Sequence, residues 1–213
     1  SALHLVLHTA LGDFTFPPQV GTFQNEAVAA EGQVVLASDG SLQGQHDATQ
    51  GWKMFCRQDG TSASDHGVVT SGGTAMSSLR PKIGGLLGGL VAVDTLLSTT
   101  TLGEGTISIR SLKVHLDNKA LISRIQKWKH RRPSQTLAPD YDLLQVAMCL
   151  VPKHNIEIHP HHVKSHQDSD IAYNKSLCEA KLNCDVDALA NQARTCLHCH
   201  NLCTTKYAPP PGH

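Results

Sequence analysis

The alternation of apolar and polar residues predicts three strands in the first part of the chain. Residues 34–37 form a short apolar run, which indicates a buried strand. The turn-forming residues Asp39-Gly40-Ser41 indicate where this strand ends. Residues 51–57 and 66–71 follow as two further strand-like segments, and the Asp59-Gly60 pair between them is typical of a hairpin. Three successive strands with short turns predict an antiparallel meander.

The longest apolar stretch, residues 79–97, is long enough to favour a helix over a strand. Four glycines stand inside it in two pairs, and each costs about 1 kcal/mol relative to alanine in a helix. Glycine pairs four residues apart leave one face of the helix bare, which is typical of close packing against a sheet. We therefore predict a helix that packs closely through Gly84, Gly85, Gly88 and Gly89.

The second half of the chain alternates strands with helices. We expect strands at 112–116 and 156–163, and helices at 119–129, 139–150 and 182–194. This alternation adds parallel strands beside the antiparallel meander. The predicted fold class is α/β, with a mixed five-stranded sheet (three antiparallel strands, then parallel strands) and helices on both faces.

Length and pattern together predict the organisation of the chain. A chain of 213 residues suits one well-buried domain with extensions. We expect an irregular leader at 1–32, the domain at 33–195, and a Cys/His-rich and Pro-rich tail at 196–213. Because the chain starts at Ser1 and not at a methionine, we interpret it as a piece of a longer protein.

Composition narrows the possible functions. A hydrophobic content of 40% excludes a globally disordered chain. The 18 basic and 18 acidic residues give a formal net charge of +0, so any nucleic-acid function requires a local basic patch. Seven cysteines, an odd number, are typical of reduced thiols or metal ligands, which favours an intracellular protein. We expect no membrane span, because no apolar run is long enough.

Two aspartates stand where predicted strands end. Asp39 follows the first strand and Asp117 follows the fourth. If these strands are parallel neighbours, both side chains point into one crevice at the edge of the sheet. Paired carboxylates without a nearby base are good ligands for hard cations. Two Mg²⁺ ions about 4 Å apart can activate a water and stabilise a leaving oxygen in phosphodiester cleavage.

The order and spacing of five short stretches are more specific than either aspartate. The chain resembles the ribonuclease H family, in the version carried by retroelement reverse transcriptases. The resemblance covers about three quarters of the chain and is carried by Ser38-Asp39-Gly40-Ser41, Ser78-Leu79-Arg80, His115-Leu116-Asp117-Asn118, His162-Val163-Lys164-Ser165-His166 and residues 183–190.

The resemblance implies roles for individual residues. Asp39, Asp117 and Asp187 correspond to three of the family's metal-binding carboxylates, and Asp185 is the alternative to Asp187. His166 corresponds to a mobile-loop histidine that assists product release or proton transfer. The implied activity is Mg²⁺- or Mn²⁺-dependent cleavage of the RNA strand of RNA–DNA hybrids, within a retroelement-type polyprotein.

One position departs from the family's pattern. The family places a glutamate two residues after the arginine, and here that place holds Lys82, after Arg80 and Pro81. The exchange changes the local charge by two units, and one unit-charge interaction at about 4 Å is worth about 4 kcal/mol at an effective dielectric near 20. We expect divalent binding to weaken severely, and the ammonium could stand in for the missing cation.

Two hypotheses therefore remain open. The first is an active ribonuclease H whose partner is an RNA–DNA hybrid and whose activity Lys82 impairs. The second is a catalytically degenerate module that keeps the fold as a structural or protein-interaction subunit, with other subunits or the rest of a polyprotein as partners.

Two further segments carry candidate chemistry. Lys127, Lys129, Arg131 and Arg132 follow a predicted helix and either grip the hybrid's DNA strand, as a comparable region does in the family, or only complement the helix dipole. In the tail, Cys196, Cys199 and Cys203 with His200 could bind zinc, although free thiols are the favoured interpretation. We interpret His159 and His161 as ordinary strand residues.

Overall fold

The computed structural model describes residues 34–44, 47–56, 62–69, 76–100, 109–130, 140–164, 173–175 and 177–205, without the side chains of 99, 100, 174 and 196–205. Among the sequence predictions, the leader at 1–32, the Asp59-Gly60 turn, Arg131, Arg132 and His166 lie outside the described residues.

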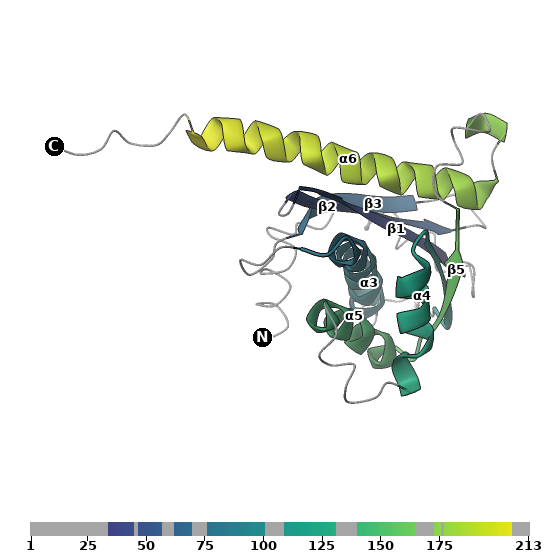
Figure 1. Ribbon diagram of the computed structural model, residues 1–213. Coiled ribbons are helices and arrows are strands. Elements are labelled where there is room, and N and C mark those ends of the chain that lie inside the picture. The colour runs from purple at the N-terminus through teal and green to yellow at the C-terminus, as the bar shows by residue number, and fades with distance from the viewer. Residues whose placement is uncertain are drawn as a thin grey trace.

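The described strands form one mixed sheet (Figure 1). Its strands are β1 (Val34–Gln43), β2 (Asp47–Cys56), β3 (Ser62–Val69), β4 (Ser111–Leu116) and β5 (Glu157–His162), in the order β3-β2-β1-β4-β5. β1 pairs antiparallel with β2, and β2 with β3, whereas β4 lies parallel to β1 and β5 parallel to β4. The predicted mixed sheet is confirmed.

Helices cover both faces of this sheet. The long α6 (Cys178–Thr205) crosses one face, and α3 (Leu79–Thr100), α4 (Lys119–Gln126) and α5 (Tyr141–Lys153) lie on the other (Figure 1). Two short 3₁₀ helices complete the described elements, η2 (Trp128–His130) after α4 and η5 (Tyr173–Lys175) before α6. The helix predicted at 119–129 therefore ends at Gln126, and α6 begins four residues before its predicted start.

Apolar side chains alternate between the two faces of β1. Val34 and Leu36 pack in the large core under α3, and Val35 and Ala37 pack against Leu182 and Val186 of α6. This alternation follows from the period of two along a strand, because each face of the sheet has its own covering helix. The second cluster packs α6 against β1 and, through Phe55, against β2.

The glycines of α3 allow this helix to lie directly on β1 and β2. A Cβ at Gly85 would stand 2.7 Å from the carbonyl oxygen of Asp39, and one at Gly88 would stand 2.7 Å from Trp52 Cδ1. Both distances are too short for a real side chain, so the predicted close packing is confirmed. The same packing brings the N-terminal turn of α3 to Asp39 and Gly40 in the middle of β1.

One described helix, α3, is long and apolar enough to pass a test for a membrane span over the 20 residues Leu79–Ser98. Length and composition alone therefore leave a span open for this helix, which the sequence analysis did not expect. However, 78% of the window is buried inside the fold. The helix therefore has the character of a core helix, whose apolar surface is already covered.

Candidate functional site at the carboxyl ends of β1 and β4

Asp39 and Asp117 lie side by side because of the register between β1 and β4. Ala37 pairs with His115 in the parallel ladder, and each aspartate stands two residues beyond this pair. Carboxyl ends of neighbouring parallel strands form a crevice at the edge of a sheet. The structure thus brings together the two carboxylates that the strand pattern predicted to meet.

The ammonium of Lys82 occupies the space between these carboxylates. Its Nζ donates to Asp39 Oδ1 at 2.5 Å and to Asp117 Oδ1 and Oδ2 at 2.8 and 2.9 Å. The side chains are 18% exposed for Lys82, 9% for Asp39 and 14% for Asp117. One cation is therefore held between two carboxylates at a site that is largely withdrawn from solvent.

Local backbone packing fixes the turn that carries Lys82. A Cβ on Gly40 would overlap the carbonyl group of Pro81, so only a glycine allows the first turn of α3 to lie this close to β1. The backbone N–H of Gly40 also donates to Asp39 Oδ1 at 2.7 Å. Gly40 thus allows α3 to pack closely against β1, and its N–H orients the carboxylate of Asp39.

A polar cluster joins the starts of α3 and α5. Ser77 Oγ accepts from the backbone N–H groups of Leu79 and Arg80, and the same hydroxyl donates to Asp140. Arg80 Nη1 lies 3.4 Å from Asp140 Oδ1 and 3.2 Å from Asp142 Oδ1. Asp140 adopts a left-handed conformation with φ of 62°, which is uncommon for a residue other than glycine. These contacts hold the turn before Lys82 against α5.

Burial and charge act in opposite directions on the site. Burial lowers the pKa of the Lys82 ammonium, but the attraction of Asp39 and Asp117 outweighs it and raises the pKa above its usual value of 10.5. Burial raises the pKa of Asp39 above 3.8, and the nearby Asp117 adds to this while Lys82 opposes it. Lys82 therefore carries its positive charge at neutral pH.

The oxygen atoms that would bind a cation already bind the ammonium. Lys82 Nζ already donates hydrogen bonds to Asp39 and Asp117. A divalent ion bound to the same carboxylates would therefore lie close to the positive charge of Lys82. Within the described part of the chain, no three His, Cys, Asp or Glu side chains form a group that could hold a metal ion. The arrangement suits a structural ion-pair cluster better than a two-metal centre.

The two candidate aspartates of α6 have different surroundings. The turn of α6 from Val186 to Ala190 packs on Gly51, the partner of Asp39 in the β1–β2 ladder, and half-buried Asp187 belongs to this turn. Asp185 Oδ2 lies 2.7 Å from Lys53 Nζ, and Tyr173 donates to Asp185 Oδ1 at 2.8 Å. Asp185 therefore ties α6 to β2 and η5. Among the described residues, Asp187 does not join Asp39 and Asp117 in a group that could hold a metal ion.

Sequence reasoning assigned no role at the site to His162 and Asn118. His162 Nε2 lies 3.2 Å from the carbonyl oxygen of Asp117 and can donate to it. Asn118 caps α4, because its side-chain oxygen accepts from the backbone N–H of Leu121 at 2.9 Å. Both residues stand inside stretches that carry the family resemblance, and this was the available signal.

The other predicted residues are spread over the molecule. Lys127 is exposed at the C-terminal end of α4, and Lys129 is exposed in η2. Cys196, Cys199, His200 and Cys203 belong to the last part of α6, for which the structure describes only the backbone.

The comparison with solved structures identifies the fold. No protein-family model matches the chain, and no curated protein is similar to it in sequence. LC11-RNase H1, solved in complex with an RNA/DNA hybrid, is similar with a TM-score of 0.50 and 13% identity over 76% of this chain and 97% of that chain. RNase H1 from the halophilic archaeon Halobacterium salinarum NRC-1 gives a TM-score of 0.50 and 18% identity over the same shares. The chain therefore has the ribonuclease H-like fold.

Proposed function

We propose that this domain binds RNA–DNA hybrid duplexes in the crevice at the carboxyl ends of β1 and β4, and that it does not cleave them with Mg²⁺ or Mn²⁺. The observation that carries the proposal is the position of Lys82 Nζ, within 2.9 Å of both Asp39 and Asp117. The domain keeps the fold and the paired carboxylates of a nuclease, and an ammonium takes the place of a metal ion.

Electrostatics support the loss of the metal. A divalent ion about 4 Å from the ammonium would be repelled by about 8 kcal/mol at an effective dielectric near 20. Without a metal ion, Asp39 and Asp117 raise the pKa of Lys82, so an incoming divalent ion meets a charged ammonium at neutral pH. A divalent ion could therefore bind only if the Lys82 side chain gave up its hydrogen bonds to Asp39 and Asp117.

Three features support hybrid binding. LC11-RNase H1 has the same fold and was solved with an RNA/DNA hybrid. Asp39 and Asp117 lie just beyond the paired part of two parallel strands, which is where ligands bind in α/β sheets. The exposed Lys127, at the end of α4, supplies a positive charge for a backbone phosphate. Because the chain has no net charge, contacts of this local kind must supply the electrostatic part of binding.

The first test separates binding from cleavage. Binding of a fluorescent RNA–DNA hybrid is measured by anisotropy in EDTA and again in Mg²⁺, and the same samples are examined for cleavage products. We expect equal affinity in both buffers, weaker binding as salt rises, and no cleavage. Mg²⁺-dependent cleavage by the unaltered protein would refute the inactive site, and absence of hybrid binding would favour a structural or protein-interaction module.

The second test alters the site itself. Lys82→Glu removes the ammonium and adds an oxygen ligand beside Asp39 and Asp117, so we expect it to gain Mg²⁺-dependent cleavage. Lys82→Met is the matched control, because it removes the ammonium without adding a carboxylate, and it is expected to stay inactive. Equal cleavage by both variants would show that the carboxylate is not what the site lacks.

We also propose that the domain works as one segment of a retroelement-type polyprotein. The support for this context is the set of short stretches shared with reverse-transcriptase-associated members, from Ser38 to Ala190. Immunodetection of the native protein tests it. A product larger than this chain, containing reverse-transcriptase peptides by mass spectrometry, is expected, and a native product lacking such peptides would contradict the proposal.

A further inference from the structure

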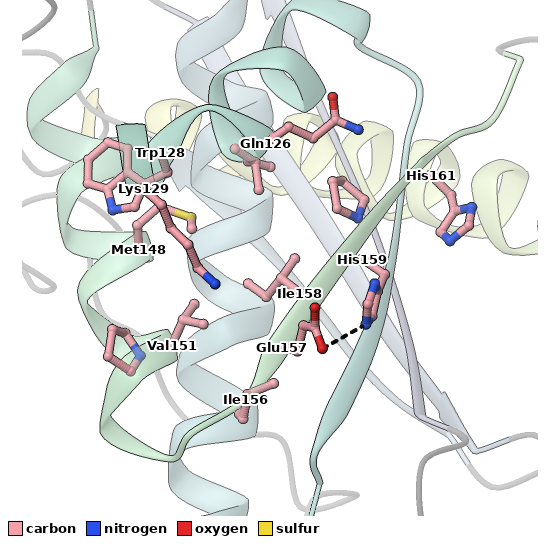
Figure 2. A pocket seen from close by; sticks show the side chains of 13 residues that line it. Gln126, Trp128, Lys129, Met148, Val151, Ile156, Glu157, Ile158, His159 and His161 are labelled. Atoms are coloured by element: carbon pink, nitrogen blue, oxygen red, sulfur yellow. Dashed lines mark ion pairs between the residues drawn. The ribbon is translucent and has the colours of Figure 1, made fainter. Parts of the chain in front are cut away.

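A groove of about 520 Å³ lies along β5, between this strand, the end of α4 with η2, and the second half of α5 (Figure 2). A groove of this size with an apolar floor and a few polar groups at its rim is typical of a binding site. It shares no residue with the Lys82 site. The aliphatic and methionine part of its lining, called the floor below, is Ile125, Met148, Val151, Ile156 and Ile158.

The backbone of β5 limits how a ligand can bind beside it. The N–H of Glu157 donates to the carbonyl of Arg110, and that of Val163 donates to the carbonyl of Leu116. Since backbone groups alternate along a strand, the even-numbered residues of β5 direct theirs away from β4, toward the edge of the described sheet. The middle one of these is Pro160, which has no N–H. An added strand would lack its central hydrogen bond, so side chains must supply the binding.

The floor of the groove favours a peptide over a nucleic acid. Single-stranded nucleic acids bind by stacking their bases on exposed aromatic rings. Trp128 is the only tryptophan, tyrosine or phenylalanine among the described residues that line the groove, and it already stacks on Tyr141 with ring centroids 5.5 Å apart. Aliphatic and methionine side chains make up the floor, and they complement leucine-like side chains through buried area.

The charged side chains at the rim of the groove determine which charged groups of a ligand can bind there. Lys129 extends from η2 into the groove above Val151 and Ile158 (Figure 2). Glu157 is the one acidic residue among those that line the groove, and its Oε2 lies 3.7 Å from His159 Nε2 on the same strand. Lys129 is therefore the cation that an acidic group of a ligand would meet.

We propose that this groove binds a short amphipathic helix of a partner protein, with aliphatic side chains on the floor and an acidic side chain on Lys129. A helix presents such anchors three and four residues apart and needs no edge hydrogen bonds. The interaction goes beyond hybrid binding and does not depend on Lys82. It would let the domain dock onto another protein while its crevice stays open.

The test uses a synthetic helical peptide with leucine three and four residues apart and glutamate at the other positions. The same peptide with lysine in place of glutamate tests charge, and a single-stranded oligothymidylate tests the nucleic-acid alternative. The chain has two tryptophans, and Trp52 is fully buried, so a change in fluorescence on binding reports on Trp128. Trp128→Phe is expected to abolish this signal.

We expect saturable binding of the glutamate peptide, and Lys129→Glu is expected to weaken it about fivefold and to favour the lysine peptide instead. Lys119→Glu is the matched control, because Lys119 is exposed on the first turn of α4 and does not line the groove. Equal binding by Lys129→Glu and wild type, no saturation up to about 1 mM, or displacement of the peptide by oligothymidylate would overturn the proposal. These peptide experiments do not measure hybrid binding, so the proposed hybrid binding is tested separately.

Discussion

Lys82→Met removes one charge from a largely enclosed ion-pair cluster. The variant keeps the apolar stem and leaves Asp39 and Asp117 facing each other without the ammonium that contacts three of their oxygens. Removing one partner of a buried ion pair costs about 3–5 kcal/mol, because the remaining charge stays buried. Since Lys82 is 18% exposed, we take the lower end and expect a loss of about 3 kcal/mol in the free energy of unfolding at neutral pH.

The loss should depend on pH in a defined way. It requires ionised carboxylates and a protonated ammonium. Because burial raises the pKa of Asp39, this carboxyl takes up a proton earlier than an ordinary aspartate as the pH falls, and the difference between variant and wild type shrinks in acid. At the alkaline end, Asp39 and Asp117 raise the pKa of Lys82, so the stabilisation is still present at pH 10.5 and is lost as the pH rises through the raised value.

Urea unfolding followed by circular dichroism measures this loss at neutral and at acid pH. Lys53→Met is the matched control, because Lys53 forms a single ion pair with Asp185 and both side chains are about one quarter exposed. That pair is expected to contribute at most about 1 kcal/mol. The reasoning is refuted if Lys82→Met is no less stable than Lys53→Met, or if its loss is the same at both pH values.

Three further predictions follow from the packing, the pKa shifts and the tail. Gly85→Ala should destabilise the fold by about 1–3 kcal/mol in the same urea assay, because its Cβ would stand 2.7 Å from the carbonyl oxygen of Asp39, and an unchanged midpoint would contradict the close packing. The hydrogen bond to Asp185 raises the pKa of Tyr173 to about 12, so the stabilisation that this bond gives is complete below pH 10.0 and is lost as the pH rises toward 12. An absorbance titration at alkaline pH should show one tyrosine with this pKa. Asp185→Asn should bring the pKa of that tyrosine back toward 10.0. Elemental analysis should find no zinc and thiol reagents should modify the cysteines of the tail, whereas one zinc per chain that is lost on replacing Cys199 would assign a metal site there.

The order of strands and the layers of the fold were predictable because they depend on local patterns. The apolar run at 34–37, the period of two after it and the glycine pairs of the first long helix each predicted an element that the structure contains. The boundaries were less accurate. β1 continues to Gln43 past the apolar run, because its ladder with β2 extends to the pair of Gln43 with Asp47 and Leu42 packs against the core.

The contacts of the site depend on distances that a sequence does not contain. The sequence placed Lys82 in the first turn of a helix, but the helix reaches Asp39 only because Gly40 admits Pro81. Arg80 and Asp140 are 60 residues apart, and no periodicity links them. Asp185 and Asp187 were alternatives in the sequence, and only the packing of α6 shows that Asp185 pairs with Lys53.

The most direct test of the central claim is a titration with Mn²⁺, followed by paramagnetic broadening of NMR signals from Asp39 and Asp117. The wild-type protein is expected to show no saturable broadening at concentrations that saturate Lys82→Glu, because the ammonium already occupies the space between the carboxylates. Saturation of the wild-type signals in the same range as the variant would contradict the account, because it would show that Lys82 leaves the site and that a divalent metal binds there.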